Sequence, residues 1–111
     1  MSTFNDLTTF QQKVLKATQE IPKGKVTTYK LLCEHIKSGS PLSVGSALKK
    51  NPSVETFFCH RVIPSNFKIG GYFGKTEGSN VDLKLDRLKE EGVSFNSKGI
   101  LEDKTKIHNF D

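Results

Sequence analysis

The segment 57–63 places Cys59 directly beside His60 and Arg61, with apolar residues on both sides. The thiolate is the nucleophilic form of cysteine, and a neighbouring base or cation makes it more available. The flanking Phe, Val and Ile residues predict a buried segment, so Cys59 is a candidate nucleophile inside a pocket. A cysteine in such surroundings is also often a small buried hydrophobe without chemistry, and this short segment does not separate the two interpretations.

The other cysteine and histidine residues do not suggest a metal site. The chain has two cysteines without a CxxC spacing and three histidines: Cys33, Cys59, His35, His60 and His108. Their separations do not match the ligand spacing of zinc sites. The glycine-rich stretch 70–74 lacks the GxGxxG spacing of a dinucleotide site, so we interpret it as a pocket wall or a tight turn. We expect no metal and no cofactor.

Size and composition indicate one small domain with an anionic partner. The chain has 111 residues, 34% hydrophobic and 26% charged, with a mean hydropathy of −0.45. No stretch approaches the ~20 apolar residues that span a bilayer, and the N-terminus does not resemble a signal peptide, so we expect an intracellular protein. The net charge of +5 favours nucleic acid as a partner, although a solvated lysine-rich surface would also explain it.

The elements that would position Cys59 begin with three helices. Thr9 and Gln12 have the spacing of a capping box, which predicts a helix from there up to Pro22. Thr28 is expected to cap a second helix over 29–36. Pro41 suits the first turn of a third helix, which runs to Lys49 and Lys50.

The second and third predicted helices form a helix-turn-helix pattern across the turn 38–40. The third helix is rich in small residues, among them Ser40, Ser43, Gly45, Ser46 and Ala47. Small side chains allow close approach of another backbone, which can be DNA or a neighbouring helix of the same domain. The basic end of this helix favours DNA.

The C-terminal half contains shorter elements. Residues 64–66 are expected to form a turn and 81–90 a last helix that stops at Gly92. A small hairpin over 93–107, turning at 96–99, should follow. The tail 108–111 is expected to fray.

Taken in order, these elements resemble the C-terminal domain of the O6-alkylguanine-DNA alkyltransferases over residues 9–93. The resemblance is carried by these elements in order: the Ile-Pro-x-Gly-x-Val exit of the first helix, Thr28-Tyr29, the Val-Gly pair of the third helix, Asn51-Pro52, Cys-His-Arg-Val at 59–62, Gly71-Tyr72 and Glu91-Gly92. It implies a mainly α fold with small β elements, of the winged helix-turn-helix type. We expect a single domain over 1–111, without the separate N-terminal domain of many family members.

The resemblance also implies direct DNA repair. Such a protein binds double-stranded DNA through the minor groove, flips an O6-alkylguanine into a pocket and moves the alkyl group permanently onto its cysteine. Cys59 would be the acceptor, His60 would take the thiol proton through a water, and Glu91 would orient His60. Asn51 would brace the active-site turn, and Arg61 would be a buried structural residue. The protein is expected to act once, as a monomer.

Further residues are assigned by the same resemblance. Tyr29 would donate a hydrogen bond to the guanine ring, and the carbonyls of Cys59 and Val62 would accept from the guanine amino group. The pocket wall would be formed by three loop residues, Tyr72, Phe73 and Gly74. The DNA surface would consist of Leu42, Ser43, Gly45, Ser46, Lys49 and Lys50.

Three positions depart from the family pattern. Phe58 stands where the family has a proline before the cysteine, and Phe73 where it has a serine. Leu42 stands where the family has an arginine that enters the base stack. Apolar side chains also enter base steps in minor-groove proteins, so we interpret Leu42 as a steric wedge.

Two other functions remain open at this stage. One is a non-catalytic alkyltransferase-like protein that binds the lesion and flags it for other repair, although such proteins usually replace the cysteine. The other is a winged-helix regulator without lesion chemistry, which would explain the charge but not the Cys-His-Arg-Val run.

Overall fold

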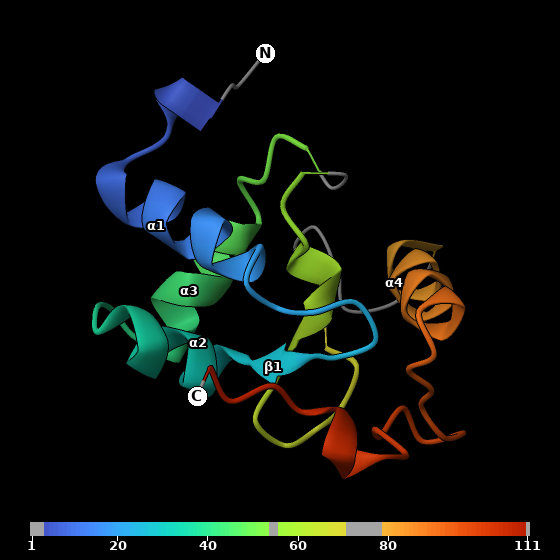
Figure 1. Ribbon diagram of the computed structural model, residues 1–111. Coiled ribbons are helices and arrows are strands. Elements are labelled where there is room, and N and C mark those ends of the chain that lie inside the picture. Colours follow the sequence, from blue (N-terminus) through green and yellow to red (C-terminus); the bar gives the residue numbers. More distant parts are fainter. Residues whose placement is uncertain (1–3, 54–55, 71–78, 111) are drawn as a thin grey trace.

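A computed structural model describes residues 4–53, 56–70 and 79–110. This part of the chain forms four α-helices, which are α1 (Thr9–Thr18), α2 (Tyr29–Ile36), α3 (Pro41–Leu48) and α4 (Ser79–Glu90). Two short strands, β1 (Thr27–Thr28) and β2 (Val62–Ile63), and three 3-10 turns, η1 (Phe4–Asp6), η2 (Cys59–Arg61) and η3 (Lys104–Lys106), complete it. Figure 1 shows η2 and β2 between the first three helices and α4.

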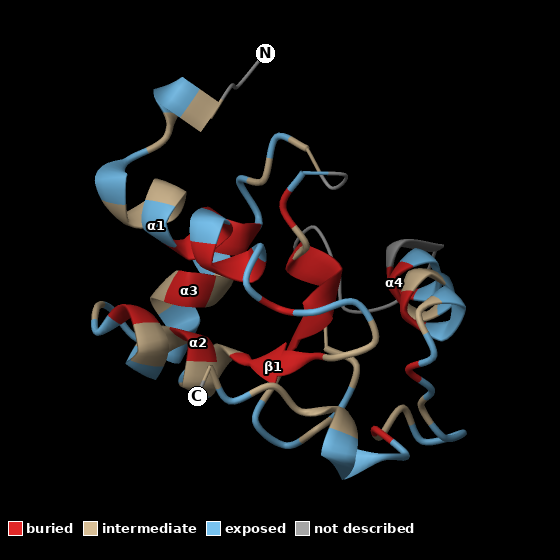
Figure 2. Ribbon diagram, in the orientation of Figure 1, coloured by how far each residue is buried: buried red, intermediate tan, exposed pale blue. Residues whose placement is uncertain are grey.

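The first three helices pack on one another and share a core. Their inward faces bury Val14, Leu15, Leu32, Val44 and Ala47, all almost fully excluded from solvent. In Figure 2 the buried residues concentrate where these helices meet and along η2 and β1. The predicted second helix is confirmed at its bounds, with Thr28 as its cap, and the third is confirmed from Pro41.

The first helix differs from its prediction at both ends. Its cap is Thr8 and its capping box is Thr8 with Gln11, one residue earlier than expected. Both registers fit the motif, but Gln12 instead donates to the carbonyls of Phe4 and Leu7 and ties η1 to the helix. The helix also ends at Thr18 rather than at Pro22, because the next N–H groups, from Gln19 to Ile21, bond three residues back and form a turn.

The two strands pair in parallel and divide the core. Thr27 pairs with Val62 and Thr28 with Ile63. Since consecutive strand residues point to opposite faces, Val62 packs with the three helices. Ile63 belongs to a second core cluster with Val26, Leu88, Val93 and Leu101. The turn η2, which directly precedes β2, therefore lies at the junction of the two clusters.

The C-terminal segment is more ordered than the sequence suggested. The turns at 64–66 and 96–99 are confirmed, and Phe95 pairs with Leu101. Beyond that pair the expected hairpin gives way to η3.

The expectation of a frayed tail is wrong for the described residues 108–110. His108 donates to the Val26 carbonyl at 2.7 Å, and the Phe110 ring stacks on His35 at 4.2 Å. Strand β1 begins only after Val26, so the backbone N–H and C=O groups of Val26 are not paired within the sheet. The C-terminal segment supplies their hydrogen-bond partners, Lys106 and His108.

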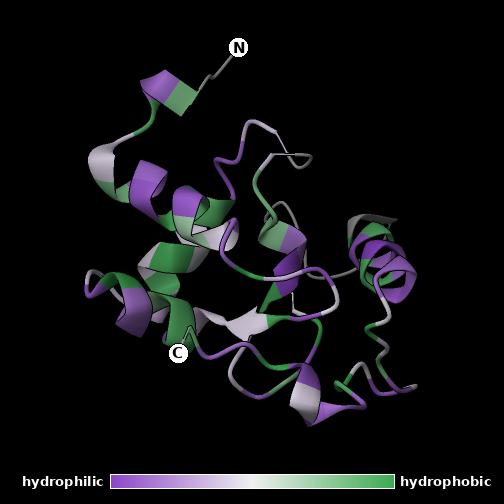
Figure 3. Ribbon diagram, in the orientation of Figure 1, coloured by the Kyte–Doolittle hydropathy of each residue, from purple (hydrophilic) through white to green (hydrophobic). Residues whose placement is uncertain are grey.

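The last helix begins at Ser79 rather than at residue 81, and it stops at Gly92, whose φ is +87°. That angle is one that glycine adopts without strain. In Figure 3 the ribbon of α3 is coloured largely as hydrophobic, whereas that of α4 alternates between hydrophobic and hydrophilic residues. Among the described residues, no helix has the length and apolar character needed to cross a membrane.

Candidate active site and nucleic-acid surface

Cys59 is the first residue of η2 and is buried, with 6% of its surface exposed. The turn is closed by backbone hydrogen bonds, since Cys59 N–H donates to the Phe57 carbonyl and Val62 N–H donates to the Cys59 carbonyl. The sulfur lies in the helical core cluster, close to Val62. Burial alone fits a core cysteine as well as a nucleophile, so the polar neighbours of the sulfur are needed to distinguish the two roles.

Asn51 is the first of these neighbours. Its Nδ2 group donates to the Phe57 carbonyl at 2.9 Å and to the Cys59 Sγ at 3.3 Å. Its Oδ1 accepts from the Ser53 N–H at 2.9 Å, which fixes the orientation of the amide. Asn51 therefore joins the end of the α3 segment to the active-site turn and places a donor on the sulfur. A donor at this position favours the thiolate over the thiol.

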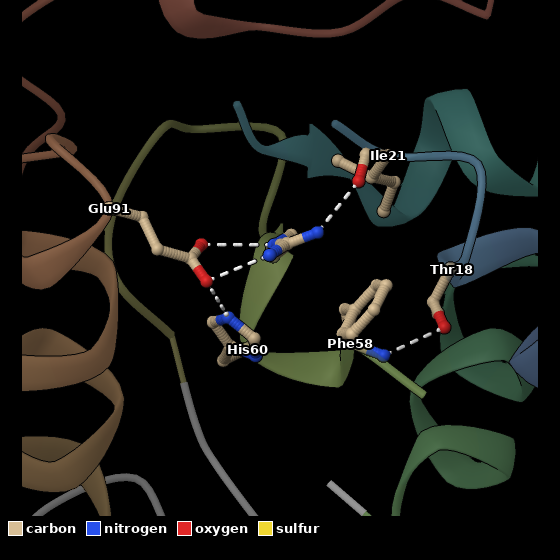
Figure 4. Close-up of polar contacts among 6 residues, drawn as sticks. Thr18, Ile21, Phe58, His60 and Glu91 are labelled. Carbon is tan, nitrogen blue, oxygen red and sulfur yellow. Dashed lines mark hydrogen bonds and ion pairs between the residues drawn. The ribbon is translucent and has the colours of Figure 1, made fainter. Parts of the chain in front are cut away.

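His60, Arg61 and Glu91 form a buried ionic network (Figure 4). Glu91 accepts from the His60 ring at 3.1 Å and from two nitrogens of Arg61 at 2.9 and 2.8 Å. The third Arg61 nitrogen, Nη1, donates to the Ile21 carbonyl at 2.9 Å. Such two-point contacts between guanidinium and carboxylate are among the strongest in proteins. They hold Glu91 in place against His60.

Burial, rather than the ionic network, favours the neutral form of His60. Burial lowers the pKa of the imidazole below its usual value, Arg87 and Arg61 lower it further, and Glu91 opposes them. Burial raises the pKa of the Glu91 carboxyl, but hydrogen bonds from Arg61 and His60 outweigh burial and lower it overall. A neutral imidazole next to a carboxylate can accept a proton. Its other ring nitrogen, Nδ1, is buried and has no hydrogen-bond partner among the described residues.

Lys84 is a site residue that the sequence interpretation missed. Its side chain is fully buried, and Nζ donates to the carbonyls of Val62 at 2.9 Å and Ile69 at 2.7 Å. Burial lowers the pKa of this ammonium to about 7, while the charge of Cys59 acts in the opposite direction. The signal was present in the helical spacing, because Lys84 lies on the same face as Val81 and Leu88. The neighbouring Leu83, which looks like a core residue, is exposed instead.

Tyr29 and Val62 lie in the neighbourhood of Cys59. Burial raises the pKa of the Tyr29 phenol, and the charge of Cys59 raises it further, so the hydroxyl remains a hydrogen-bond donor. The Val62 carbonyl already accepts from Lys84, but a carbonyl oxygen has two lone pairs and can accept a second bond. Tyr72, Phe73 and Gly74 lie outside the described residues.

The expected DNA surface is on the open side of α3. Leu42 is 83% exposed, and Ser46, Lys49 and Lys50 are exposed as well. Ser43 is half-buried, since it forms the capping box of α3 with Ser40. A Cβ atom on Gly45 would have no neighbour within 4 Å, so among the described atoms no packing contact requires glycine there. Among the described residues, close helix packing therefore does not account for Gly45.

The described residues of the site supply the donors and acceptors for nucleophilic chemistry. Within the described ranges no group of three His, Cys, Asp or Glu side chains is close enough to hold an ion. The arrangement instead combines a buried sulfur, an amide donor on it, a neutral histidine backed by a carboxylate and a buried lysine. This is the pattern of an activated cysteine.

Comparison with known proteins agrees with this pattern. The family model described as "6-O-methylguanine DNA methyltransferase, DNA binding domain" matches residues 9–93. The methylated-DNA–protein-cysteine methyltransferase of Methanothermobacter thermautotrophicus is 39% identical over 92 residues, which are 83% of this chain and 49% of that protein. The chain spans about half the length of the curated relatives it matches.

Solved structures give the same result. The Mycobacterium tuberculosis OGT in complex with DNA superimposes with a TM-score of 0.68 at 35% identity, over 77% of this chain and 50% of that one. The S. pombe Atl1 in complex with damaged DNA containing O6-carboxymethylguanine gives a TM-score of 0.63 at 31% identity, over 97% of this chain and 93% of that one. The expected mainly helical, winged helix-turn-helix fold is thereby confirmed. The chain belongs to the 6-O-methylguanine DNA methyltransferase family.

Proposed function

We propose that this protein repairs double-stranded DNA by transferring the alkyl group of an O6-alkylguanine to Cys59, once per molecule and as a monomer. The observation that carries the proposal is the position of Cys59 Sγ, 3.3 Å from the Asn51 amide and one residue before the His60–Glu91 pair. The family membership supports it. The contacts at Cys59, His60 and Glu91 favour transfer over lesion binding alone.

The transfer is a direct displacement. The thiol proton of Cys59 passes to neutral His60 through a water that the unpartnered Nδ1 can bind. The sulfur then forms a bond to the alkyl carbon while the bond from that carbon to guanine O6 breaks, and the electron pair goes to the purine. The proton returns to the guanine base. The products are an S-alkylcysteine and unmodified guanine.

The neighbouring residues support the two ends of this displacement. At the sulfur, the Asn51 amide and the positive charge of Lys84 favour the thiolate. At the leaving group, the Tyr29 hydroxyl donates to the guanine ring and reduces its developing negative charge. Glu91 stabilises the imidazolium that His60 becomes during the step.

DNA engagement follows from α3 and the charge of the chain. Gly45 and Ser46 let the helix backbone approach the floor of the minor groove, Leu42 fills the place of the flipped base, and Lys49 and Lys50 contact phosphates. The substrate base then enters the pocket beside Cys59. Because the thioether is permanent, each molecule acts once and is not regenerated.

Stoichiometry tests the proposal. A duplex with one O6-methylguanine is incubated with increasing protein, and the restored guanine is counted by digestion and chromatography. We expect at most one guanine restored per protein, reached rapidly, and none with Cys59→Ala. Tight binding without restored guanine would instead identify a lesion-binding protein, and equal affinity for damaged and undamaged duplex would identify a regulator.

A further inference from the structure

Phe58, the residue before the nucleophile, contacts two of the three residues of the ionic network, Arg61 and His60. The Arg61 guanidinium lies over the Phe58 ring, 4.1 Å from its centroid. The His60 ring meets the same ring edge-on at 6.2 Å. The face of the guanidinium is therefore covered by an aromatic ring while its edge bonds to Glu91 and Ile21.

The backbone of Phe58 adds a contact that proline lacks. Its N–H donates to the Thr18 hydroxyl of α1 at 3.0 Å, and that hydroxyl donates onward to the Leu15 carbonyl. Figure 4 shows Phe58 between Thr18 and the His60–Glu91 pair. Proline has no N–H, so a proline at this position would break the link to α1 and remove the ring from Arg61.

From these contacts we infer that Phe58 is a positioning residue for the transfer reaction, which fixes Arg61 by its ring and the active-site turn by its N–H. It acts on Cys59 indirectly, because Arg61 holds Glu91 and Glu91 holds His60. The inference rests on the proposed chemistry at Cys59. A proline at this position would restrain the turn through its ring. In this protein the contacts of Phe58 provide that restraint instead.

The inference has a consequence for the pH dependence. The charged groups that act on His60 are Glu91, Arg61 and, from α4, Arg87. Without the Phe58 ring, water reaches Arg61 and His60, and burial then lowers the pKa of His60 less than before. In such a variant His60 therefore becomes protonated at a higher pH than in the wild type. The acid limb, where the rate falls with falling pH, moves to higher pH.

The experiment measures the reactivity of Cys59 in two ways across pH 5 to 9, as alkylation by iodoacetamide mapped by mass spectrometry and as methyl transfer from a lesion duplex. Phe58→Leu and Phe58→Met remove the ring, and Phe58→Tyr keeps it. Ring removal is expected to slow both reactions by roughly tenfold and to shift the acid limb upward, as loss of a partly buried cation–π contact would. Phe58→Tyr should restore the wild-type limb.

Phe67→Leu is the matched control. The Phe67 ring lies 5.2 Å from the Lys104 ammonium and packs against the second core cluster, so its loss should lower the melting temperature without moving the limb. Phe58→Pro and Thr18→Val test the backbone link and should each slow the reaction. An unmoved limb in both ring-removal variants would overturn the inference. Failure of wild-type methyl transfer would refute the proposed function, and the iodoacetamide profiles would still test Phe58.

Discussion

The Lys84 ammonium donates a hydrogen bond of 2.9 Å to the carbonyl of Val62, the residue that follows the Cys59–Arg61 turn. This bond ties α4 to β2 from within the core. A second bond, to the Ile69 carbonyl, ties in the segment beyond the 64–66 turn. Burying a lysine costs stability unless its donors are satisfied, and the proximity of the Cys59 charge gives a functional reason for the burial.

The lowered pKa of Lys84 should be visible in the pH dependence of the free energy of unfolding. The folded protein releases the proton of this group at about pH 7, whereas the unfolded chain holds it until about 10.5. The unfolded state therefore binds more protons between these values, and the contribution of Lys84 to stability rises with pH. Urea unfolding at pH 7 and pH 9 should show a steeper rise for the wild type than for Lys84→Met. The exposed Lys89→Met is the control, and equal slopes in all three proteins would contradict the assignment.

Glu91 should be needed for both catalysis and folding. Glu91→Gln loses the ion pair with Arg61 and weakens the support of His60, so we expect transfer to slow about 10²-fold, as for a lost general base. Leaving Arg61 without its carboxylate should destabilise the fold by about 3 kcal/mol. Single-turnover kinetics and urea titration measure the two effects. Glu90→Gln, next to it and exposed, should change neither, and a full transfer rate in Glu91→Gln would exclude the proposed relay.

Substitution of Gly45 by alanine should raise the stability of the protein and weaken its binding to duplex DNA. A methyl group has room there within the protein, so Gly45→Ala should stabilise the helix by about 1 kcal/mol. The same methyl group should obstruct the approach to DNA and weaken duplex binding. Thermal unfolding and fluorescence anisotropy measure the pair. Higher stability with unchanged affinity would remove α3 from the DNA interface.

Leu42 should contribute to base flipping by filling the space that the flipped base leaves in the stack. With 2-aminopurine at the target position, Leu42→Ala should give less fluorescence than the wild type at the same bound fraction, because nothing fills the vacated stack. Leu83→Ala is the matched control, since Leu83 is also exposed but lies on α4. Equal flipping by wild type and Leu42→Ala would end the wedge hypothesis.

The sequence predicted the helices and part of the site because these depend on local patterns and on a resemblance. Thr28 is a side chain that caps a helix and Pro41 is favoured in a first helical turn, so the starts of α2 and α3 were predicted correctly. The Thr8 cap was missed because Thr8 and Thr9 both have a glutamine three residues later, and only the packing of η1 selects one register.

Long-range contacts account for the remaining differences. The tail looked unsupported because its partner, Val26, is far away in sequence. Lys84 was overlooked because a lysine is expected at the surface, whereas here its ammonium donates to the carbonyls of Val62 and Ile69 inside the fold. The contact of Phe58 with Arg61 also depends on the turn geometry, which composition does not specify.

The most direct test of the central claim is the intact mass of the protein after incubation with duplex DNA containing O6-methylguanine. The account predicts a gain of one methyl group, mapped by peptide sequencing to Cys59 and not to Cys33, and no gain in Cys59→Ala. Stable binding of the lesion by protein of unchanged mass would contradict it.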